Sequence, residues 1–394
     1  MSATLQWVGP LFLGIVCAAA RAPAGTASGP RAVPKKLIQY GWGIPTPDFI
    51  REHIREMEKR PFDGLIFQLH GAGRVLEPQP LPEAKLAKDL DDLKHIEWKK
   101  FTDNFIVMWA ASKQDWFNDE HWKAIEHNVR LLARAARVGR CVGVCFDPEP
   151  YGANPWAYSQ APHRKTKSFA DYEAIVRRRG AQFIRAVQAE MPKARVLTFF
   201  QLSILRGSLR PMDPKQRAAG LAKAHYGLLA AFLNGMLDAA GDEVTIIDGN
   251  ETAYYYTDSR QHLDAYHCMR QRGLALIDPK LWGKYRRHVR AGQALYIDQC
   301  FGLRTRKVLG HYMTPDERRK WFEHNVYWAL ATADRYVWCY GERMHWWKNE
   351  KIPPGCEEAI VSARRKRAAG QPLGFDIRGV IDAARKRQRA AGGK

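Results

Sequence analysis

The sequence predicts an α/β fold, a parallel (β/α)8 barrel of the TIM type, on three observations. From Lys35 onward, eight short runs of β-forming residues alternate with long amphipathic segments, which is the number that such a barrel requires. The chain has 394 residues, within the range of one barrel with insertions. The Gly-rich phosphate-binding turn of the competing fold, an open doubly wound sheet, is missing after the first run.

The predicted strands are short and rich in β-branched and aromatic residues. In chain order they are Lys36–Trp42, Asp63–His70, Asn104–Ala110, Cys141–Asp147, Arg195–Leu202, Val244–Asp248, Ala294–Asp298 and Arg335–Tyr340. Apolar residues at helical spacing predict the segments between them, as Ile50, Ile54 and Met57 do for the first helix. These helices are expected at Pro47–Arg60, Asp119–Ala136, Asp171–Met191, Leu228–Leu237, Gln261–Gln271 and Pro315–Ala331.

The N-terminus has the pattern of a secretory signal peptide. Trp7 to Ala20 is apolar and ends in small residues, and a Pro/Gly/Ala/Ser-rich stretch follows to about Pro34. We therefore expect a signal peptide over 1–20, a linker over 21–34, a catalytic barrel over 35–360 and a basic C-terminal extension over 361–394. The protein would be exported, to the periplasm or the extracellular space. No later run is long and apolar enough to cross a membrane.

Composition bounds the function further. Hydrophobic residues make up 46% of the chain and charged residues 26%, which excludes a disordered or fibrous protein. The net charge of +21 comes partly from the C-terminal extension, and most other basic residues lie at helical spacing among Glu and Ala. We therefore expect no nucleic-acid partner. An anionic glycan, an anionic envelope or solubility alone would each explain the charge.

The chain contains no motif for a metal or a cofactor. Six cysteines remain after Cys17, without a C-x-x-C, and neither H-x-H nor H-E-x-x-H occurs. We expect the cysteines to be small buried thiols, one disulfide being compatible with export. No cofactor is expected.

Polar and aromatic residues stand where most of the predicted strands end. They are Trp42, His70, Trp109, Asp147 with Glu149, Gln201, Asp248 through Glu251, Asp298 and Glu342. In a barrel, the carboxyl ends of the strands form the face that carries the active site. These residues are therefore candidates for binding or reaction.

Strand alternation indicates which of these side chains point toward the barrel axis. In the fourth strand, Asp147 and Glu149 share one face, opposite Val144 and Phe146. Branched and aromatic residues belong against the helices, so the acidic pair is expected to face inward. Asp298 shares its face with Tyr296 in the seventh strand.

The eighth and sixth strands complete this picture. Glu342 shares its face with Tyr336, Trp338 and Tyr340. After the sixth strand, either Asp248 and Asn250 or Gly249 and Glu251 would face the pocket. A single acidic residue at a strand end is usually a helix cap or an ion-pair partner. Carboxylates converging from several strands instead raise one another's pKa, which produces a protonated acid beside an ionised base.

The segment Asp147-Pro148-Glu149-Pro150-Tyr151, with carboxylates after strands seven and eight and Trp-rich loops, resembles the (β/α)8-barrel glycoside hydrolases. The resemblance covers roughly residues 35–350 and is mainly one of architecture. The large retaining clan has its acid/base after strand four, usually as Asn-Glu, and a nucleophilic Glu after strand seven. Pro148-Glu149 and Asp298 stand at those places here.

Two other barrel groups are similar to the sequence. Chitinase-like barrels end strand four in Asp-x-Glu, which Asp147-Pro148-Glu149 matches, although Cys145 and Gly143 replace the earlier acidic residues of their repeat. A third group uses carboxylates after strands four and six, here Asp147 or Glu149 with Glu251. The clan stays open.

The resemblance implies a glycosidase that acts on a polysaccharide or oligosaccharide with paired carboxylates. Glu149 would be the general acid/base, and Glu342 or Asp298 the nucleophile or assisting base, with Asp147 and Glu251 nearby. The expected sugar-binding residues are Trp42, His70, Trp109, Tyr151, Gln201, Asn250, Tyr254, Tyr340, Trp346 and Trp347. The separation of the carboxylates would decide between retention and inversion.

Two alternatives come from other classes of function. His70, Glu149, Glu251 and Asp298 are suitable ligands for a hard cation, as in a metal-dependent sugar isomerase or lyase on the same barrel. The second alternative is a barrel that binds glycans without reacting with them.

Overall fold

The computed structural model describes residues 34–110, 114–209 and 213–392, and their strands form one closed parallel sheet. The strands are β1 Lys36–Gly41, β2 Gly64–Phe67, β3 Phe105–Trp109, β4 Gly143–Asp147, β5 Arg195–Thr198, β6 Thr245–Asp248, β7 Val289–Ala291, β8 Gln293–Tyr296 and β9 Tyr336–Gly341. Their order in the sheet is β7-β6-β5-β4-β3-β2-β1-β9-β8. The predicted barrel is confirmed.

The barrel closes through one stretch of chain, residues 289–296. Its first half, β7, pairs with β6, and its second half, β8, pairs with β9. Only Gly292 separates the halves, and its N–H donates to the carbonyl of Asp248 at 2.8 Å. A Cβ on Gly292 would lie 3.0 Å from Ile247 and 3.1 Å from that carbonyl oxygen. Together, β7 and β8 therefore take the place of the seventh strand of an eight-stranded barrel.

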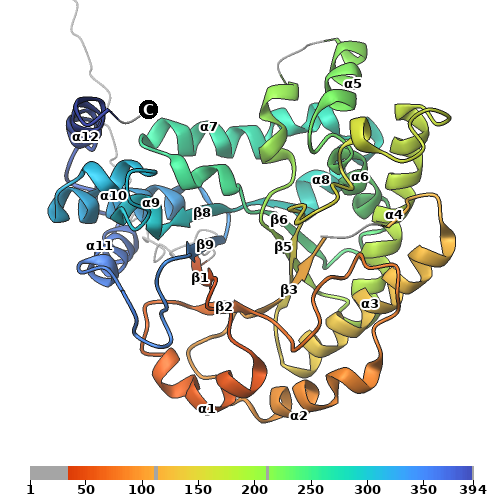
Figure 1. The fold of residues 1–394 in the computed structure, drawn as a ribbon, viewed down its shortest axis with the longest axis horizontal. Coiled ribbons are helices and arrows are strands. Elements are labelled where there is room, and N and C mark those ends of the chain that lie inside the picture. Colours follow the sequence, from red (N-terminus) through yellow and green to blue (C-terminus); the bar gives the residue numbers. More distant parts are fainter. Residues whose placement is uncertain (1–33, 111–113, 210–212, 393–394) are drawn as a thin grey trace, which may run out of the picture. The chain divides into compact units, whose positions relative to one another are not determined.

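Helices surround the strands (Figure 1). They are α1 Pro47–Met57, α2 Ala87–His95, α3 Asp119–Val138, α4 Phe169–Glu190, α5 Pro214–Lys223, α6 Leu229–Ala239, α7 Ser259–Arg270, α8 Trp282–His288, α9 Ile297–Phe301, α10 Pro315–Thr332, α11 Cys356–Ala368 and α12 Arg378–Ala390. Short 3-10 helices are η1 Glu83–Leu86, η2 Tyr158–Gln160, η3 Leu202–Leu209, η4 Glu251–Tyr255, η5 Arg272–Leu276, η6 Pro279–Leu281 and η7 Leu309–Tyr312. Capping boxes at Ser168 and Thr314 fix the starts of α4 and α10.

The inside of the barrel is aromatic. Phe199, beyond the end of β5, stacks on Trp338 of β9 with ring centroids 4.2 Å apart. The ring centroid of Tyr40, in β1, lies 4.7 Å from that of Phe199. Because these rings fill the axis, the barrel is a packed core whose open space lies at the ends of the strands.

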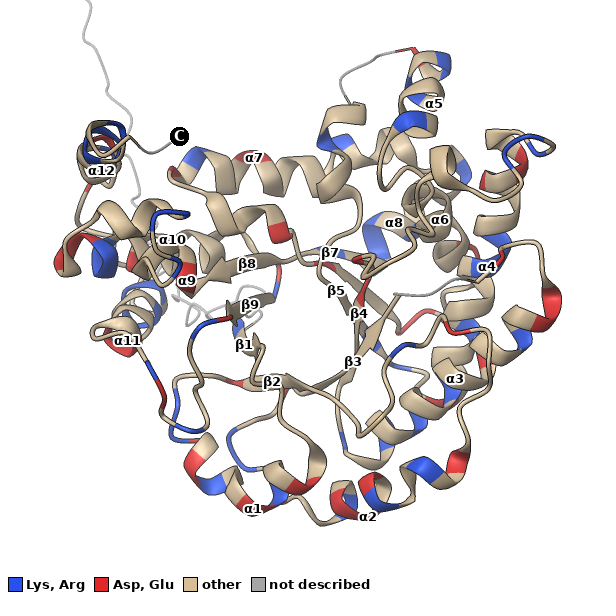
Figure 2. Ribbon diagram, in the orientation of Figure 1, with Lys and Arg blue, Asp and Glu red and all other residues tan. Residues whose placement is uncertain are grey.

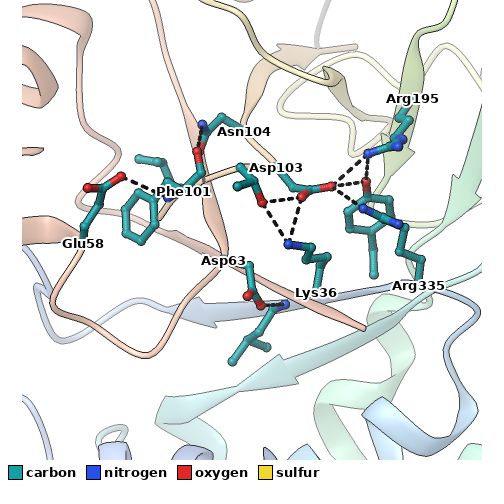
Figure 3. Close-up of polar contacts among 12 residues, drawn as sticks. Lys36, Glu58, Asp63, Phe101, Asp103, Asn104, Arg195 and Arg335 are labelled. Carbon is teal, nitrogen blue, oxygen red and sulfur yellow. Dashed lines mark hydrogen bonds and ion pairs between the residues drawn. The ribbon is translucent and has the colours of Figure 1, made fainter. Parts of the chain in front are cut away.

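The opposite end of the barrel is held by one carboxylate, Asp103 (Figure 3). It accepts a hydrogen bond from the Tyr336 hydroxyl at 2.6 Å and pairs with Arg195 at 2.9 Å, Arg335 at 3.2 Å and Lys36 at 3.3 Å. Burial acts against its charge, but hydrogen bonds from Tyr336 and Thr102 hold the pKa of Asp103 below its usual value. Asp103 thus connects the starts of β1, β5 and β9.

Two expectations need correction. The seventh strand begins at Val289, earlier than expected, and ends at Tyr296, so Asp298 belongs to α9. The expected boundary at residues 360/361 falls inside α11, which packs against α10 and buries Ile360 and Ala363. The basic residues of α11 are not simply solvated, since Arg364 pairs with Asp63 at 2.9 Å and Lys366 with Glu323 at 2.7 Å.

Surface charge is mixed over much of the barrel. Figure 2 shows Lys and Arg interleaved with Asp and Glu on α1, α2 and α3, as expected for solvated faces. Among the described residues, all six cysteines are free and buried, as predicted, and no helix has the length and apolarity to cross a membrane. The expected signal peptide and nearly all of the linker lie outside the described residues.

Candidate active site

Carboxyl side chains from three strand ends line one cavity of about 220 Å³. Glu149 follows β4, Glu251 begins η4 after β6, and Glu342 follows β9. The other lining residues are Tyr40, Trp42, Tyr151, Phe199, Tyr254, Tyr255, Tyr296, Arg304 and Tyr340. The cavity therefore combines acidic groups with an almost wholly aromatic wall.

Below Glu149 lies Asp147, fully buried at the end of β4. One Asp147 oxygen accepts the N–H of Glu149 at 2.8 Å, and the other lies 3.0 Å from the Tyr151 hydroxyl. That hydroxyl is also 2.7 Å from Glu149 Oε2. One hydroxyl proton cannot serve both carboxyls. Burial raises the pKa of Asp147 to about 8, so near neutrality Asp147 holds a proton and can donate to Tyr151, which donates to Glu149.

Glu251 is carried into the cavity by a turn after β6. Asn250 adopts left-handed backbone angles, and the Glu251 N–H donates to the carbonyl of Phe199 at 3.0 Å. Asp248 does not line the cavity: it is buried and accepts the backbone N–H groups of Gln201 at 3.1 Å and Ser203 at 2.8 Å. Strand alternation left open whether Asp248 and Asn250 or Gly249 and Glu251 face the cavity. The structure places Glu251 in the cavity.

Burial raises the pKa of Glu251 to about 8, and the negative charge of Glu149 adds to this effect. A carboxyl group with this pKa is protonated at neutral pH. It can therefore give a proton to a leaving group, while an ionised neighbour acts as a base or nucleophile.

Glu342 is the third carboxylate of the cavity, and its neighbours hold it in place. Its Oε2 accepts a hydrogen bond from the Tyr296 hydroxyl at 2.7 Å and lies 3.7 Å from Arg304 Nη1. Asp298 supports it from below, because its two oxygens accept the N–H groups of Glu342 and Arg343, both at 2.8 Å. Asp298 is itself buried and does not line the cavity. The structure thus places Asp298 outside the cavity, bonded to the backbone that carries Glu342.

Aromatic rings form both the wall and the rim. Tyr254 and Tyr340 stack with their ring centroids 5.7 Å apart and an interplanar angle of 15°. At the rim, Trp42 is 70% exposed, Tyr151 52% and Tyr255 59%, and among the described residues these are the three most exposed large aromatic side chains. Exposed flat rings around a polar cavity are suited to the apolar faces of sugar rings.

Several expected sugar-binding residues lie elsewhere. His70 Nδ1 contacts Asp89 Oδ1 at 2.6 Å, and Trp109 lines a separate cavity of about 540 Å³ beside β2 and β3. Gln201 is buried, and Asn250 is buried against Gln293 at 2.8 Å. Trp346 and Trp347 pack on Phe62, with ring centroids 5.1 Å and 6.5 Å away. None of these side chains lines the carboxylate cavity.

The structure also adds residues that the sequence did not single out. Tyr40 and Tyr296 stand at inward positions of their strands, so alternation could have found them. Arg304 lies in a loop, where no periodic signal exists. Tyr226, between α5 and α6, is a further neighbour: burial, then the charges of Glu149 and Glu251, raise its pKa.

The ligand set of the metal-dependent alternative does not assemble. Of His70, Glu149, Glu251 and Asp298, only the two glutamates line the cavity. His70 is held by Asp89, and both oxygens of Asp298 are occupied by backbone N–H groups. Within the described residues, no group of three or more His, Cys, Asp or Glu side chains is arranged to hold a metal ion.

No family model matches this sequence, and no curated protein is similar to it. Solved structures that resemble the fold include a GH18 chitinase from Pseudoalteromonas aurantia, at 11% identity and a TM-score of 0.41, covering 84% of this chain and 100% of that one. A GH5-4 broad-specificity endoglucanase from Clostridium acetobutylicum has 10% identity and a TM-score of 0.43, over 83% and 96% of the two chains.

A protein from Anabaena variabilis, assigned as a sugar phosphate isomerase/epimerase, has 11% identity and a TM-score of 0.40, over 91% and 98%. Glycoside hydrolase barrels are thus among the structural neighbours, as the sequence resemblance led us to expect. At these values no neighbour assigns an activity to this chain.

Proposed function

We propose that this protein is an exported glycoside hydrolase that cleaves glycosidic bonds in a polysaccharide or oligosaccharide. One observation carries the proposal: Glu149, Glu251 and Glu342 line a single cavity with an aromatic wall and rim. Glycoside hydrolysis needs one carboxylic acid and one carboxylate on either side of the bond, and it needs surfaces on which sugar rings can stack.

In the proposed reaction, Glu251 is the general acid. Its raised pKa keeps the proton available for the glycosidic oxygen at neutral pH. Glu149, whose charge contributes to that pKa, is the base or nucleophile, oriented by the Tyr151 hydroxyl at 2.7 Å. The sequence suggests Glu149 as the acid; the raised pKa of Glu251 reverses the two roles in this proposal.

Glu342 assists from the third side of the cavity. Tyr296 and Arg304 fix the position of its carboxyl group, where it can stabilise the positive charge that develops on the sugar ring in the transition state. Export is supported by the apolar run from Trp7 to Ala20. N-terminal sequencing of secreted protein should begin after about residue 20, and a retained Met1 would contradict export.

The test is a screen of the purified protein on neutral and acidic polysaccharides and oligosaccharides, with release of reducing ends as the readout. Glu149→Gln should abolish most of the turnover while keeping glycan binding, and Glu120→Gln, an exposed glutamate of α3, is the matched control. If Glu149 is the nucleophile of a retaining enzyme, azide should restore activity to Glu149→Gly and give a glycosyl azide of inverted anomeric configuration. Binding without any turnover would instead support a glycan-binding barrel, and activity lost on chelation and restored by a divalent cation would support the isomerase or lyase alternative.

A further inference from the structure

A second, smaller hollow adjoins the candidate active site on the side of Glu342. It has a volume of about 200 Å³ and is lined by Leu303, Arg304, Thr305, Lys307 and Arg343. Four of these residues lie in the loop between α9 and η7, and Arg343 follows Glu342 after β9. Arg304 lines both the hollow and the carboxylate cavity, so the two spaces are neighbours at this side chain.

The hollow is strongly cationic. Three of its lining residues are basic, and no acidic side chain of the described chain lines it. The nearest carboxylate is Glu342, 3.7 Å from Arg304 and 3.4 Å from Arg343. Within the described residues, Lys307 forms no ion pair. One carboxylate thus faces three cations, which leaves uncompensated positive charge beside the reacting groups.

This arrangement differs from the other inward-facing basic residues of the barrel. At the opposite end, Lys36, Arg195 and Arg335 converge on the buried Asp103 and so complete a structural network. Among the described residues, the Arg304, Lys307 and Arg343 group has Glu342 as its one paired carboxylate, which leaves Lys307 without an ion pair, and the group opens to solvent, since the Arg304 side chain is 33% and the Arg343 side chain 58% exposed. The fold does not need these charges for its packing.

Resting on the proposed function, we propose that this hollow is a subsite for an anionic substituent, a carboxylate or a sulfate ester, on the sugar next to the cleaved bond. The planar fork of a guanidinium matches the paired oxygens of these groups, and Lys307 and the Thr305 hydroxyl supply further donors. The substrate is therefore an acidic glycan, bound with its charged substituent against Arg343 and Lys307 and its ring against the aromatic wall.

Two matched pairs of probes test this inference by isothermal titration calorimetry. The carboxylate pair is oligogalacturonate and its methyl ester; the sulfate pair is a carrageenan oligosaccharide, whose galactan backbone carries no carboxylate, and its chemically desulfated form. We expect the wild-type protein to bind at least one charged member more tightly than its neutral partner. The Lys307→Ala, Arg343→Ala double variant should bind that charged probe about tenfold or more weakly, with the neutral partner changed less than about twofold. Added salt should weaken only the charged interaction.

The control is Lys123→Ala with Lys193→Ala, which removes the same charge from exposed positions on other faces. Equal loss in both double variants, equal affinity for charged and neutral probes, or no binding of any charged probe would overturn the inference. Cleavage of neutral glycans alone would leave the hydrolase and remove the subsite. Binding of a charged probe through Arg343 and Lys307, without cleavage of any glycan, would support the subsite and contradict the hydrolase.

Discussion

Two carboxyl groups that differ by one turn of backbone do different work in this molecule. Asp248 is buried, and its oxygens accept hydrogen bonds from backbone N–H groups. Glu251, three residues later, lines the cavity. The same division recurs on the other side, where Asp298 holds the backbone that presents Glu342. In both cases an aspartate fixes a loop, and the longer glutamate side chain reaches the reacting space.

Glu251→Gln should lower kcat by about 10²–10⁴-fold, because the amide cannot donate the proton that general acid catalysis requires. Affinity for the glycan should stay within a few fold of the wild type, since the shape of the side chain is retained. Steady-state kinetics on a soluble glycan measures both values. Glu243→Gln, at an exposed position before β6, should behave as wild type.

The pH profile gives an independent check on this residue. In the wild type, kcat/KM should fall as pH rises through about 8, where Glu251 loses its proton. A Glu251→Gln protein with near wild-type turnover, or a wild-type profile that is flat between pH 7 and 9, would remove Glu251 from the role of acid.

The same carboxyl group predicts a pH-dependent stability difference. Its pKa is about 4.5 in the unfolded chain and about 8 in the folded protein, so the folded state prefers the protonated form. Below pH 4.5 both states are protonated and Glu251 costs little. Between pH 4.5 and 8 the unfolded state ionises first, and the folded protein loses relative stability.

Glu251→Gln should therefore be more stable than the wild type at pH 9, by about 1–3 kcal/mol, with the difference shrinking toward pH 4. Thermal melts of both proteins across this range measure it. If the stability difference between Glu251→Gln and the wild type instead grew toward acid pH, the pKa of Glu251 would not be raised in the folded protein.

Strand alternation predicts a side chain's direction only as far as the strand continues. Alternation along β4 and β9 placed Glu149 and Glu342 at the cavity, because both strands run straight to their ends. It failed for Asp298, because β8 stops at Tyr296 and a helical turn begins, which changes the direction of every later side chain. Arg304 lies in a loop, where residue identity carries no period.

At the scale of elements, the eight strand positions could be read from the sequence because each buried run is short, apolar and bounded by polar residues. The start of the seventh strand was missed for a physical reason. Val289–Ala291 contains Arg290 and follows directly on Arg286, Arg287 and His288, so its two apolar residues are hidden in a basic run. The last barrel helix was missed similarly, since α11 is rich in arginine while its opposite face is buried.

Substitutions at two adjacent residues test whether one face of α11 is part of the core. Ile360 is fully buried, whereas Val361 is 53% exposed. Ile360→Ala should lower the free energy of unfolding by about 2–5 kcal/mol, because it leaves a cavity against α10. Val361→Ala should change it by less than about 0.5 kcal/mol.

Urea unfolding followed by circular dichroism compares the two variants. Equal and small effects would mean that α11 is a peripheral extension, as the sequence had suggested, and that its removal would leave the barrel intact.

At the scale of the whole barrel, Asp103 joins segments that are distant in sequence but meet at one end. Asp103→Asn should lower stability by about 3 kcal/mol at pH 7, because Arg195, Arg335 and Lys36 lose their shared counterion. Since the folded-state pKa of Asp103 is depressed, its contribution is present above the unfolded pKa and is lost as pH falls through the folded value. The gap between the variant and the wild type should therefore narrow below about pH 4.

Thermal melts at pH 7 and pH 3 measure that gap. Asp242→Asn removes an exposed aspartate that pairs with Arg287 at 3.0 Å, and it should be nearly neutral at both values. A gap at pH 7 no larger than that of Asp242→Asn would show that the network does not hold the barrel together.

The closure of the sheet between β1 and β9 also governs how the chain can reach this structure. The Lys35 ammonium is hydrogen-bonded to the carbonyl of Ala333, 298 residues further along the chain. During synthesis, β1 must therefore wait with one edge unpaired until almost the entire barrel has left the ribosome. Contacts this distant in sequence slow folding, and an open apolar edge favours association with other chains. Under the proposed export, the chain would also have to stay unfolded until it had crossed a membrane, so late closure of the barrel and export would both require that the edge of β1 be kept from pairing during the same interval.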